Sequence, residues 1–468
     1  MFKSRTRERR IFTSRKRMRT RSSIFSTIAS FILIFLVLEL LTRIFVDISG
    51  NRSQFARANN KSDLLKAYKL DFVNNEPNPK YASDTVTLKA KPSLSVGYKL
   101  LSNQENEHWQ INAEGFRDRD SLPLTKPKDE IRIFLLGGST AFGYGSPNNQ
   151  ATISEYLEQR LEQRLAQQKA SPKLYKPDLL PFDKVEKKKY LAKPSKIKPG
   201  KYRVINAAVP GYASGNELAQ LALQVLKYKP DLIVVLDGYQ DLMLQSDREA
   251  VNPPPMNTDD RKPTSFVGYL SKAIEPLENK SYLAKVAQNR WLKDREDFQK
   301  QDFLLDEQPS NFARYLPQTK DELQRRVDRY VDRLHQILNL SAAAQIPLVV
   351  AIQPEITGRD PSQLTDVEGK IATELGRTYI QQVRNSYPAL IEATQQLAKA
   401  FPKNMKALDL YQLTDKYPSP SFIDAIHLNQ TANQKVAEQL YYAIANLPKM
   451  QLVPAQAKPP QPRYRKPY

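Results

Sequence analysis

The sequence predicts an α/β fold, a three-layer α/β/α domain around a central parallel sheet of about five strands. Several short apolar runs show no alternation of polar and apolar residues, which is typical of strands buried on both faces. Stretches with helical spacing separate these runs, as in βα units whose strands pair in parallel. No repeat of 20–50 residues is visible, so a solenoid or propeller is not expected.

The elements follow one another in a regular order. Strands are expected at 131–136, 202–206, 232–236, 347–352 and 407–410. Helices are expected at 151–167, 215–228, 321–344, 365–401 and 433–447. Two insertions interrupt the alternation, a Lys- and Pro-rich stretch at 168–201 and a longer one at 248–320. We expect both insertions to shape the substrate cleft of a main domain that spans 128–447.

Residues 47–127 are polar and irregular and lead into the main domain. Short strands are expected at 95–101 and 109–112, on either side of a turn. The segment Asn112-Ala-Glu-Gly-Phe-Arg117 carries a turn signal at Gly115.

The N-terminus reads as a membrane anchor. Residues 1–23 contain ten Lys and Arg side chains against Glu8 alone, and a largely apolar stretch follows at 24–46. This stretch is close to the length of about 20 residues that a helix needs to cross a bilayer. Glu39 and Arg43 are four residues apart, so they can pair on one helix face. We expect a signal anchor with a cytoplasmic N-terminus and an extracytoplasmic, periplasmic or luminal, main domain.

The alternative is a cleaved signal peptide, which would have a shorter apolar run followed by a small-x-small cleavage site. The segment Ala56-Arg57-Ala58 is a poor and distant candidate for such a site. The length of the apolar stretch therefore favours the uncleaved anchor.

Composition excludes several classes of function. The chain has no cysteine, so disulfides, thiolate catalysis and cysteine-based zinc sites are ruled out. The net charge is +21, but much of it lies at the two ends, in 1–23 and in a basic, Pro-rich tail at 448–468. A nucleic-acid-binding protein would gather this charge on a folded face with interleaved aromatic residues, so we expect no nucleic-acid partner.

Three of the expected strands are followed by small or polar residues. In an open parallel sheet, binding and catalytic sites form at the carboxyl ends of the strands. Ser139 lies in Gly137-Gly-Ser-Thr, Gly211 in Val209-Pro-Gly, and Gln240 in Gly238-Tyr-Gln-Asp241. The first segment lacks the lysine of a phosphate-binding P-loop and is not the G-x-S-x-G elbow of α/β-hydrolases. Asp241 is expected to be a capping or structural residue.

A fourth segment supplies a candidate base. Asp424 precedes His427 by three residues, a spacing at which the carboxylate can orient the ring and set its tautomer. The other two histidines, His108 and His335, have no strand-end context, and a surface or packing role is expected for them.

In this order, the four segments resemble the signature blocks of the SGNH (GDSL-type) hydrolases. The resemblance covers about 128–447, and the lead-in from Asn112 to Arg117 is similar to segments that precede the serine block in membrane-anchored members. It implies a flavodoxin-like α/β/α domain and a serine esterase that acts on ester bonds without a metal or cofactor. It also implies the catalytic residues Ser139, Asp424 and His427, and an oxyanion hole from Ser139, Gly211 and Gln240.

One position departs from the family pattern, because the family's asparagine is Gln240 here. Glutamine keeps the amide donor but extends it by one methylene, and loss of one oxyanion donor typically costs about 10²–10³-fold in rate. Three functions therefore stay open: an esterase for O-acyl groups of envelope glycans or lipids, an acyltransferase with the same site, and a non-catalytic protein that binds glycan or scaffolds partners. The acyl group, the alcohol part and the oligomeric state cannot be inferred from the residues.

Overall fold

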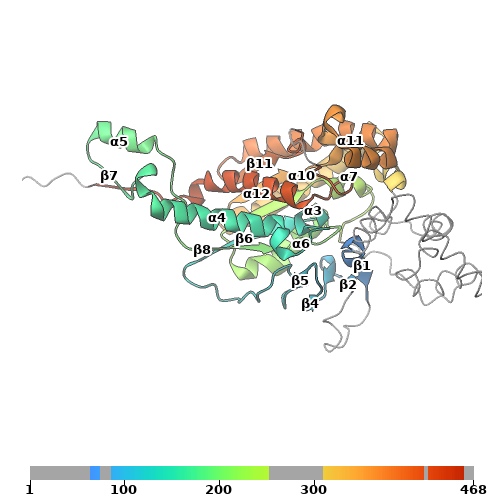
Figure 1. The fold of residues 1–468 in the computed structure, drawn as a ribbon, viewed down its shortest axis with the longest axis horizontal. Helices are drawn as coiled ribbons and strands as arrows, with labels where there is room; N and C mark the ends of the chain where they lie inside the picture. Colours follow the sequence, from blue (N-terminus) through green and yellow to red (C-terminus); the bar gives the residue numbers. More distant parts are fainter. Residues whose placement is uncertain (1–63, 74–85, 252–308, 416–419, 458–468) are drawn as a thin grey trace, which may run out of the picture. The chain divides into compact units, whose positions relative to one another are not determined.

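A single parallel sheet of five strands forms the centre of the fold in the computed structural model, which describes residues 64–73, 86–251, 309–415 and 420–457 (Figure 1). Across the sheet the strands are ordered β11 (Met405–Asp409), β10 (Leu348–Ile352), β9 (Leu232–Asp237), β6 (Glu130–Gly137) and β8 (Lys201–Asn206). All neighbouring pairs are parallel, which confirms the predicted sheet. Every residue of β9 and β10 is buried, as the unbroken apolar runs predict.

The order of the strands locates the place where a site can form. Numbered along the chain, the five strands lie in the order 2-1-3-4-5 across the sheet, the flavodoxin-like arrangement. The first strand, β6, therefore lies between the second, β8, and the third, β9. In sheets with this strand order, ligands bind outside the carboxyl ends of the strands at the point where the order reverses, which here is beside β6.

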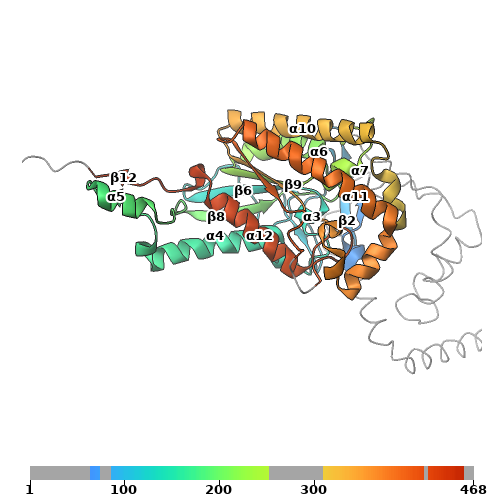
Figure 2. The same ribbon diagram turned by 90° about the horizontal axis from the view of Figure 1, so that it is seen from above.

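Helices cover both faces of the sheet. Figure 2 shows α4 (Ile153–Ala170) and α12 (Gln430–Ala445) on one side, where they pack against each other. On the other side lie α6 (Ser214–Gln220), α10 (Lys320–Ala343) and α11 (Asp366–Ala400). The helix α11 has a non-helical residue at Gly376, with φ of 81°, so it is two helices joined at a kink. Each of these elements confirms a helix that the sequence spacing predicts.

The described part of the lead-in forms two small sheets. One contains β1 (Leu70–Phe72), β2 (Leu88–Ser93) and β3 (Gly97–Leu100), and the other β4 (Gln104–Glu105) and β5 (Gln110–Ile111). The strands β1, β2 and β4 were not predicted, and the two predicted strands, β3 and β5, pair with β2 and β4 and not with each other. Trp109 is buried, and its indole nitrogen donates to the carbonyl of Ala67 at 2.8 Å. These contacts tie both sheets into the same hydrophobic core as the main sheet.

The insertion at 168–201 lies away from the carboxyl end of β6. It contains β7 (Leu179–Leu180) and α5 (Lys184–Leu191), and β7 pairs with β12 (Ala455–Gln456) near the C-terminus. Figure 2 shows α5 well away from α3 (Ser139–Phe142), at the far end of α4. A substrate cleft beside α3 would therefore lie away from this insertion, contrary to the expectation that the insertion shapes it. The helix α4 returns the chain to the amino edge of the sheet, and the insertion lies between α4 and the first residue of β8.

Several sequence predictions lie outside the described residues. These are the basic segment 1–23, the anchor 24–46, most of the insertion 248–320 and the end of the basic tail. Within the ranges that the structure describes, no helix is both long and apolar enough to span a bilayer.

Candidate active site

Ser139 follows β6 directly and begins the short helix α3. The turn between them requires glycine at 137, because its φ is 147° and a β-carbon there would lie 2.3 Å from the carbonyl oxygen of Leu236. Glycine has no β-carbon and adopts this conformation at low cost. The main chain can therefore turn within two residues, which places Ser139 at the carboxyl edge of the sheet.

The segments with Gly211 and Gln240 meet at this turn. A β-carbon on Gly138 would lie 3.1 Å from the carbonyl oxygen of Tyr212 and 3.3 Å from Cγ of Gln240. The same position is 3.8 Å from Nε2 of Gln240. Gly211 has φ of 85°, a conformation that favours glycine. Three segments that are far apart in the sequence therefore converge beside Ser139.

Asp424 and His427 form a hydrogen-bonded pair. Nδ1 of His427 lies 2.6 Å from Oδ2 of Asp424, and Oδ1 accepts the backbone amide of His427 at 2.8 Å. The surrounding protein opposes charge on Asp424, but His427 and the nearby amides outweigh it and lower the pKa of this carboxyl. A charged carboxylate on Nδ1 leaves Nε2 of the ring as the nitrogen that can take a proton.

The loop with His427 contacts the turn with Ser139 through Thr140. The Thr140 hydroxyl donates to the carbonyl of Ile426 at 3.2 Å and accepts from Nε2 of Gln353 at 3.1 Å. Nε2 of His427 is buried and has no hydrogen-bond partner among the described residues. The serine and histidine segments therefore adjoin each other, while no hydrogen bond joins Ser139 to His427.

A buried arginine connects the lead-in to the end of α3. Arg117 donates to the carbonyls of Phe142 and Gly143 at 2.9 and 2.8 Å, and to the Tyr68 hydroxyl at 2.8 Å. Its own amide donates to the carbonyl of Asn206 at 3.0 Å, at the end of β8. Burial lowers the pKa of the Arg117 guanidinium. The segment from Asn112 to Arg117 is thus part of the support beneath the serine turn.

Three acidic side chains are buried on or next to the helix α7 (Tyr239–Met243), which carries Gln240. Asp241 accepts from the Ser214 hydroxyl at 2.5 Å and from its amide at 3.1 Å, which confirms the expected structural role. Asp237 accepts from Tyr330 at 2.7 Å; burial and the charge of Asp241 raise its pKa to about 7. Burial also raises the pKa of Glu217. This cluster fixes the start of α6 against α7.

A further buried carboxyl is linked to α7 through tyrosine hydroxyls. Glu355 accepts from the Tyr379 hydroxyl at 2.9 Å and from the Thr357 amide at 2.7 Å. The hydroxyls of Tyr379 and Tyr239 are 3.0 Å apart, so this network reaches the residue before Gln240. Burial raises the pKa of Glu355 to about 7.

Residues after the fourth strand were missed by the sequence analysis. Gln353 and Glu355 follow β10 directly, so the rule that sites form at strand ends could have identified both. Thr140 gave no comparable signal, because its contact with the carbonyl of Ile426 depends on the distant loop around His427.

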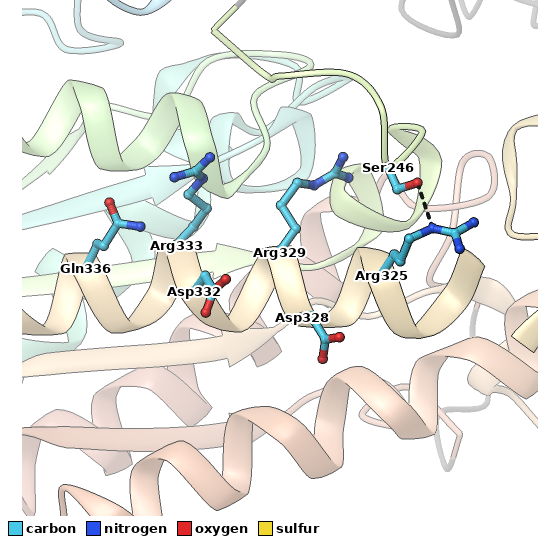
Figure 3. Close-up of a pocket in the computed structure, with 7 residues that line it drawn as sticks. All are labelled: Ser246, Arg325, Asp328, Arg329, Asp332, Arg333 and Gln336. Atoms are coloured by element: carbon cyan, nitrogen blue, oxygen red, sulfur yellow. Dashed lines mark hydrogen bonds between the residues drawn. The ribbon is translucent and has the colours of Figure 1, made fainter. Parts of the chain in front are cut away.

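A surface hollow of about 360 Å³ lies along α10, and Ser139, Asp424 and His427 do not line it (Figure 3). The guanidinium of Arg329 donates to the carbonyls of Leu244 and Gln245 at 2.7 and 2.6 Å. It therefore anchors the chain that follows α7. The lining residues are Ser246, Arg325, Asp328, Arg329, Asp332, Arg333 and Gln336. None of the predicted site residues is among them.

The part of the chain that the structure describes contains no group of three or more His, Asp or Glu side chains that could hold a metal ion.

The fold and the site together define a flavodoxin-like α/β/α protein in which a serine turn and an Asp–His pair adjoin each other at the carboxyl edge of the sheet. The chain matches no protein-family model and no curated protein. Among solved structures it is similar to a lipase/acylhydrolase from Enterococcus faecalis, with 14% identity and a TM-score of 0.34 over 70% of this chain and 100% of that one.

Two further solved structures are similar at the same level. A GDSL-like lipase from Bacteroides thetaiotaomicron has 11% identity and a TM-score of 0.28, over 69% of this chain and 92% of that one. The esterase EstA from Pseudoalteromonas sp. has 11% identity and a TM-score of 0.31, over 67% and 96%. Similarities this low decide neither the fold nor the activity of this chain.

Proposed function

We propose that this protein is a serine esterase of the SGNH (GDSL) type that hydrolyses O-acyl esters. The observation that carries the proposal is the Asp424–His427 pair, at 2.6 Å, on a loop that Thr140 joins to the serine turn. A carboxylate-bound imidazole next to a serine at a strand end is the arrangement that activates a hydroxyl for attack on a carbonyl.

The proposed reaction has two steps. Nε2 of His427 takes the proton of Ser139 as its Oγ attacks the ester carbonyl, and the protonated ring then gives this proton to the leaving alcohol. Water, deprotonated by the same nitrogen, cleaves the acyl-serine and regenerates the hydroxyl. The amides of Ser139 and Gly211 and the side-chain amide of Gln240 are the proposed donors to the oxyanion. An acceptor hydroxyl in place of water would make the same site an acyltransferase.

The proposed location is outside the cytoplasmic membrane, with the chain anchored by residues 24–46. This proposal rests on the length of the apolar stretch and on the basic residues before it. An envelope glycan or a lipid with O-acyl groups is the substrate class that such a location favours.

Labelling by a fluorophosphonate tests the proposal directly, because the reagent modifies only an activated serine. The full chain should be labelled at Ser139 and should hydrolyse p-nitrophenyl acetate. Ser139→Ala and His427→Ala should lose both signals, while Ser246→Ala on the remote hollow should keep both. Equal hydrolysis by the full chain and Ser139→Ala would refute the esterase.

A non-catalytic role is the second candidate. Two observations favour it: Nε2 of His427 is not bonded to Ser139, and Gln240 stands where the family has asparagine. An unlabelled Ser139 in a folded full chain would support this role.

A further inference from the structure

Tyr144 covers one face of the His427 ring, although the proposed reaction does not use it. The two ring centroids are 4.2 Å apart and the ring planes differ by 18°, so the rings are stacked. The backbone amide of Tyr144 donates to the carbonyl of Ser139 at 3.0 Å. One residue is therefore tied to the candidate nucleophile by its main chain and to the candidate base by its side chain.

The lead-in residues 64–73 hold the Tyr144 ring in place. The Tyr144 hydroxyl donates to the carbonyl of Leu65 at 3.3 Å, and its ring centroid lies 5.1 Å from that of Tyr68. Tyr68 is fully buried and donates to the carbonyl of Ser146 at 2.5 Å. It also accepts the bond from Arg117. A continuous set of contacts thus runs from the lead-in through Tyr144 to His427.

Two different constraints act on the imidazole. The bond from Nδ1 to Asp424 fixes the edge of the ring, but a single bond at one nitrogen leaves the ring free to rock out of its plane. A stacked aromatic ring opposes this motion, and such pairs contribute about 0.5–1.5 kcal/mol beyond the area they bury. Since Nε2 has no partner among the described residues, the stack is the second contact that limits where this nitrogen points.

We propose that Tyr144 is a positioning residue for His427, and that the lead-in segment 64–73 belongs to the active site because it holds Tyr144. This inference rests on the proposed esterase function. It extends the site beyond the four segments that the sequence predicts, to a segment that comes before the main domain in the sequence.

Two substitutions in the full chain separate the ring from its hydroxyl. Tyr144→Phe keeps the stack and should retain kcat on p-nitrophenyl acetate within about threefold. Tyr144→Leu removes the stack and should lower kcat by about 10- to 100-fold, the size expected for a catalytic group displaced by about 1 Å. KM should change by less than about twofold in both, because Tyr144 orients the base and does not bind the ester. Tyr442→Leu, at a half-exposed tyrosine on α12, is the matched control and should leave kcat unchanged.

A chemical measurement tests the positioning without relying on activity. Diethyl pyrocarbonate modifies accessible imidazoles, and mass spectrometry resolves each histidine separately. The His427 side chain is 13% exposed and that of His108 is 18% exposed, so His108 serves as an internal reference. His427 should be modified faster in Tyr144→Leu than in the wild type or in Tyr144→Phe, with His108 unchanged.

The two measurements distinguish the possible failures. Hydrolysis by the wild type no faster than by Ser139→Ala would end the proposed function, while the modification rates would still decide the role of Tyr144. If the wild type is active and Tyr144→Leu matches it in kcat, the positioning role is overturned. An unchanged modification rate at His427 overturns it whatever the activity.

Discussion

The carboxylate of Asp424 binds His427 twice, through the ring at 2.6 Å and through the backbone amide at 2.8 Å. The bond to the backbone amide fixes the short loop between the two residues. The ring is therefore held with Nδ1, and not Nε2, against the carboxylate. The spacing of three residues that the sequence displays is what permits both bonds. The remaining nitrogen, Nε2, is then the one that the proposed reaction uses as its base.

Asp424→Asn should leave the loop intact and remove the charged oxygen that binds Nδ1 of His427. We expect kcat on p-nitrophenyl acetate to fall by about 10⁴-fold, the size seen when a triad carboxylate is replaced by an amide. Asp328→Asn, on the surface of α10, should leave kcat unchanged. A loss of less than about tenfold would show that Asp424 is not the orienting carboxylate.

Gln240→Ala tests the proposed third oxyanion donor. Nε2 of Gln240 reaches the serine turn. Loss of this amide donor should lower kcat by about 10²-fold or more, with little change in KM. Gln240→Asn restores the family residue and shows whether the shorter amide also reaches. Gln245→Ala, at an exposed position just after α7, is the control. Full activity of Gln240→Ala would show that Gln240 is not an oxyanion donor, and the proposed donors would then be the amides of Ser139 and Gly211 alone.

Arg117→Ala should destabilise the fold and weaken labelling of Ser139. The buried carbonyls of Phe142 and Gly143 would each lose a bond from a charged donor, and such a bond contributes about 1.5–3 kcal/mol. Each carbonyl keeps a second donor, Nδ2 of Asn206 for Phe142 and the amide of Ser146 for Gly143. We expect the free energy of unfolding, measured with urea, to fall by about 3 kcal/mol or more. Arg333→Ala removes an exposed ion pair with Glu249 and should change it by less than about 0.5 kcal/mol. Equal effects of the two substitutions would contradict the role of Arg117.

Glu355→Gln should change how stability depends on pH. The folded-state pKa of Glu355 is raised to about 7 from 4.5, so the folded protein holds a proton that the unfolded chain has released between these values. Stability from this group therefore falls as pH rises from about 4.5 to about 7 and stays low above that. Glutamine is neutral throughout, so its stability relative to the wild type should improve from pH 5 to pH 8. Urea unfolding at the two pH values measures this, and parallel behaviour of both proteins would contradict the buried neutral carboxyl.

Much of the architecture could be predicted from local patterns. The apolar runs that became β6, β8, β9, β10 and β11 lie within about two residues of their observed bounds. The two central strands β9 and β10 are buried along their whole length, and such strands must be apolar throughout. The strands β1 and β2 could not be found in this way. Both are short and partly exposed, and β2 contains Lys89, Lys91 and Pro92 in place of an apolar run.

The site was only partly visible in the sequence. Ser139, Gly211 and Gln240 were identifiable as candidates because each follows an expected strand, and His427 because Asp424 stands three residues before it. Nothing in the sequence around Tyr144 or Arg117 indicates that these residues support the site. Their contacts join residues that are separated by tens to hundreds of positions in the chain.

By itself the sequence determined the alternation of strands and helices and the residues that stand at the strand ends. Both depend on local properties, namely the burial of apolar side chains at a fixed period and the conformations that glycine allows. Only the tertiary structure decided that Tyr144 stacks on His427, that Arg117 supports the serine turn and that the insertion at 168–201 lies far from the site. These relationships arise when separate elements pack, and packing depends on the whole arrangement of the elements and not on any one segment.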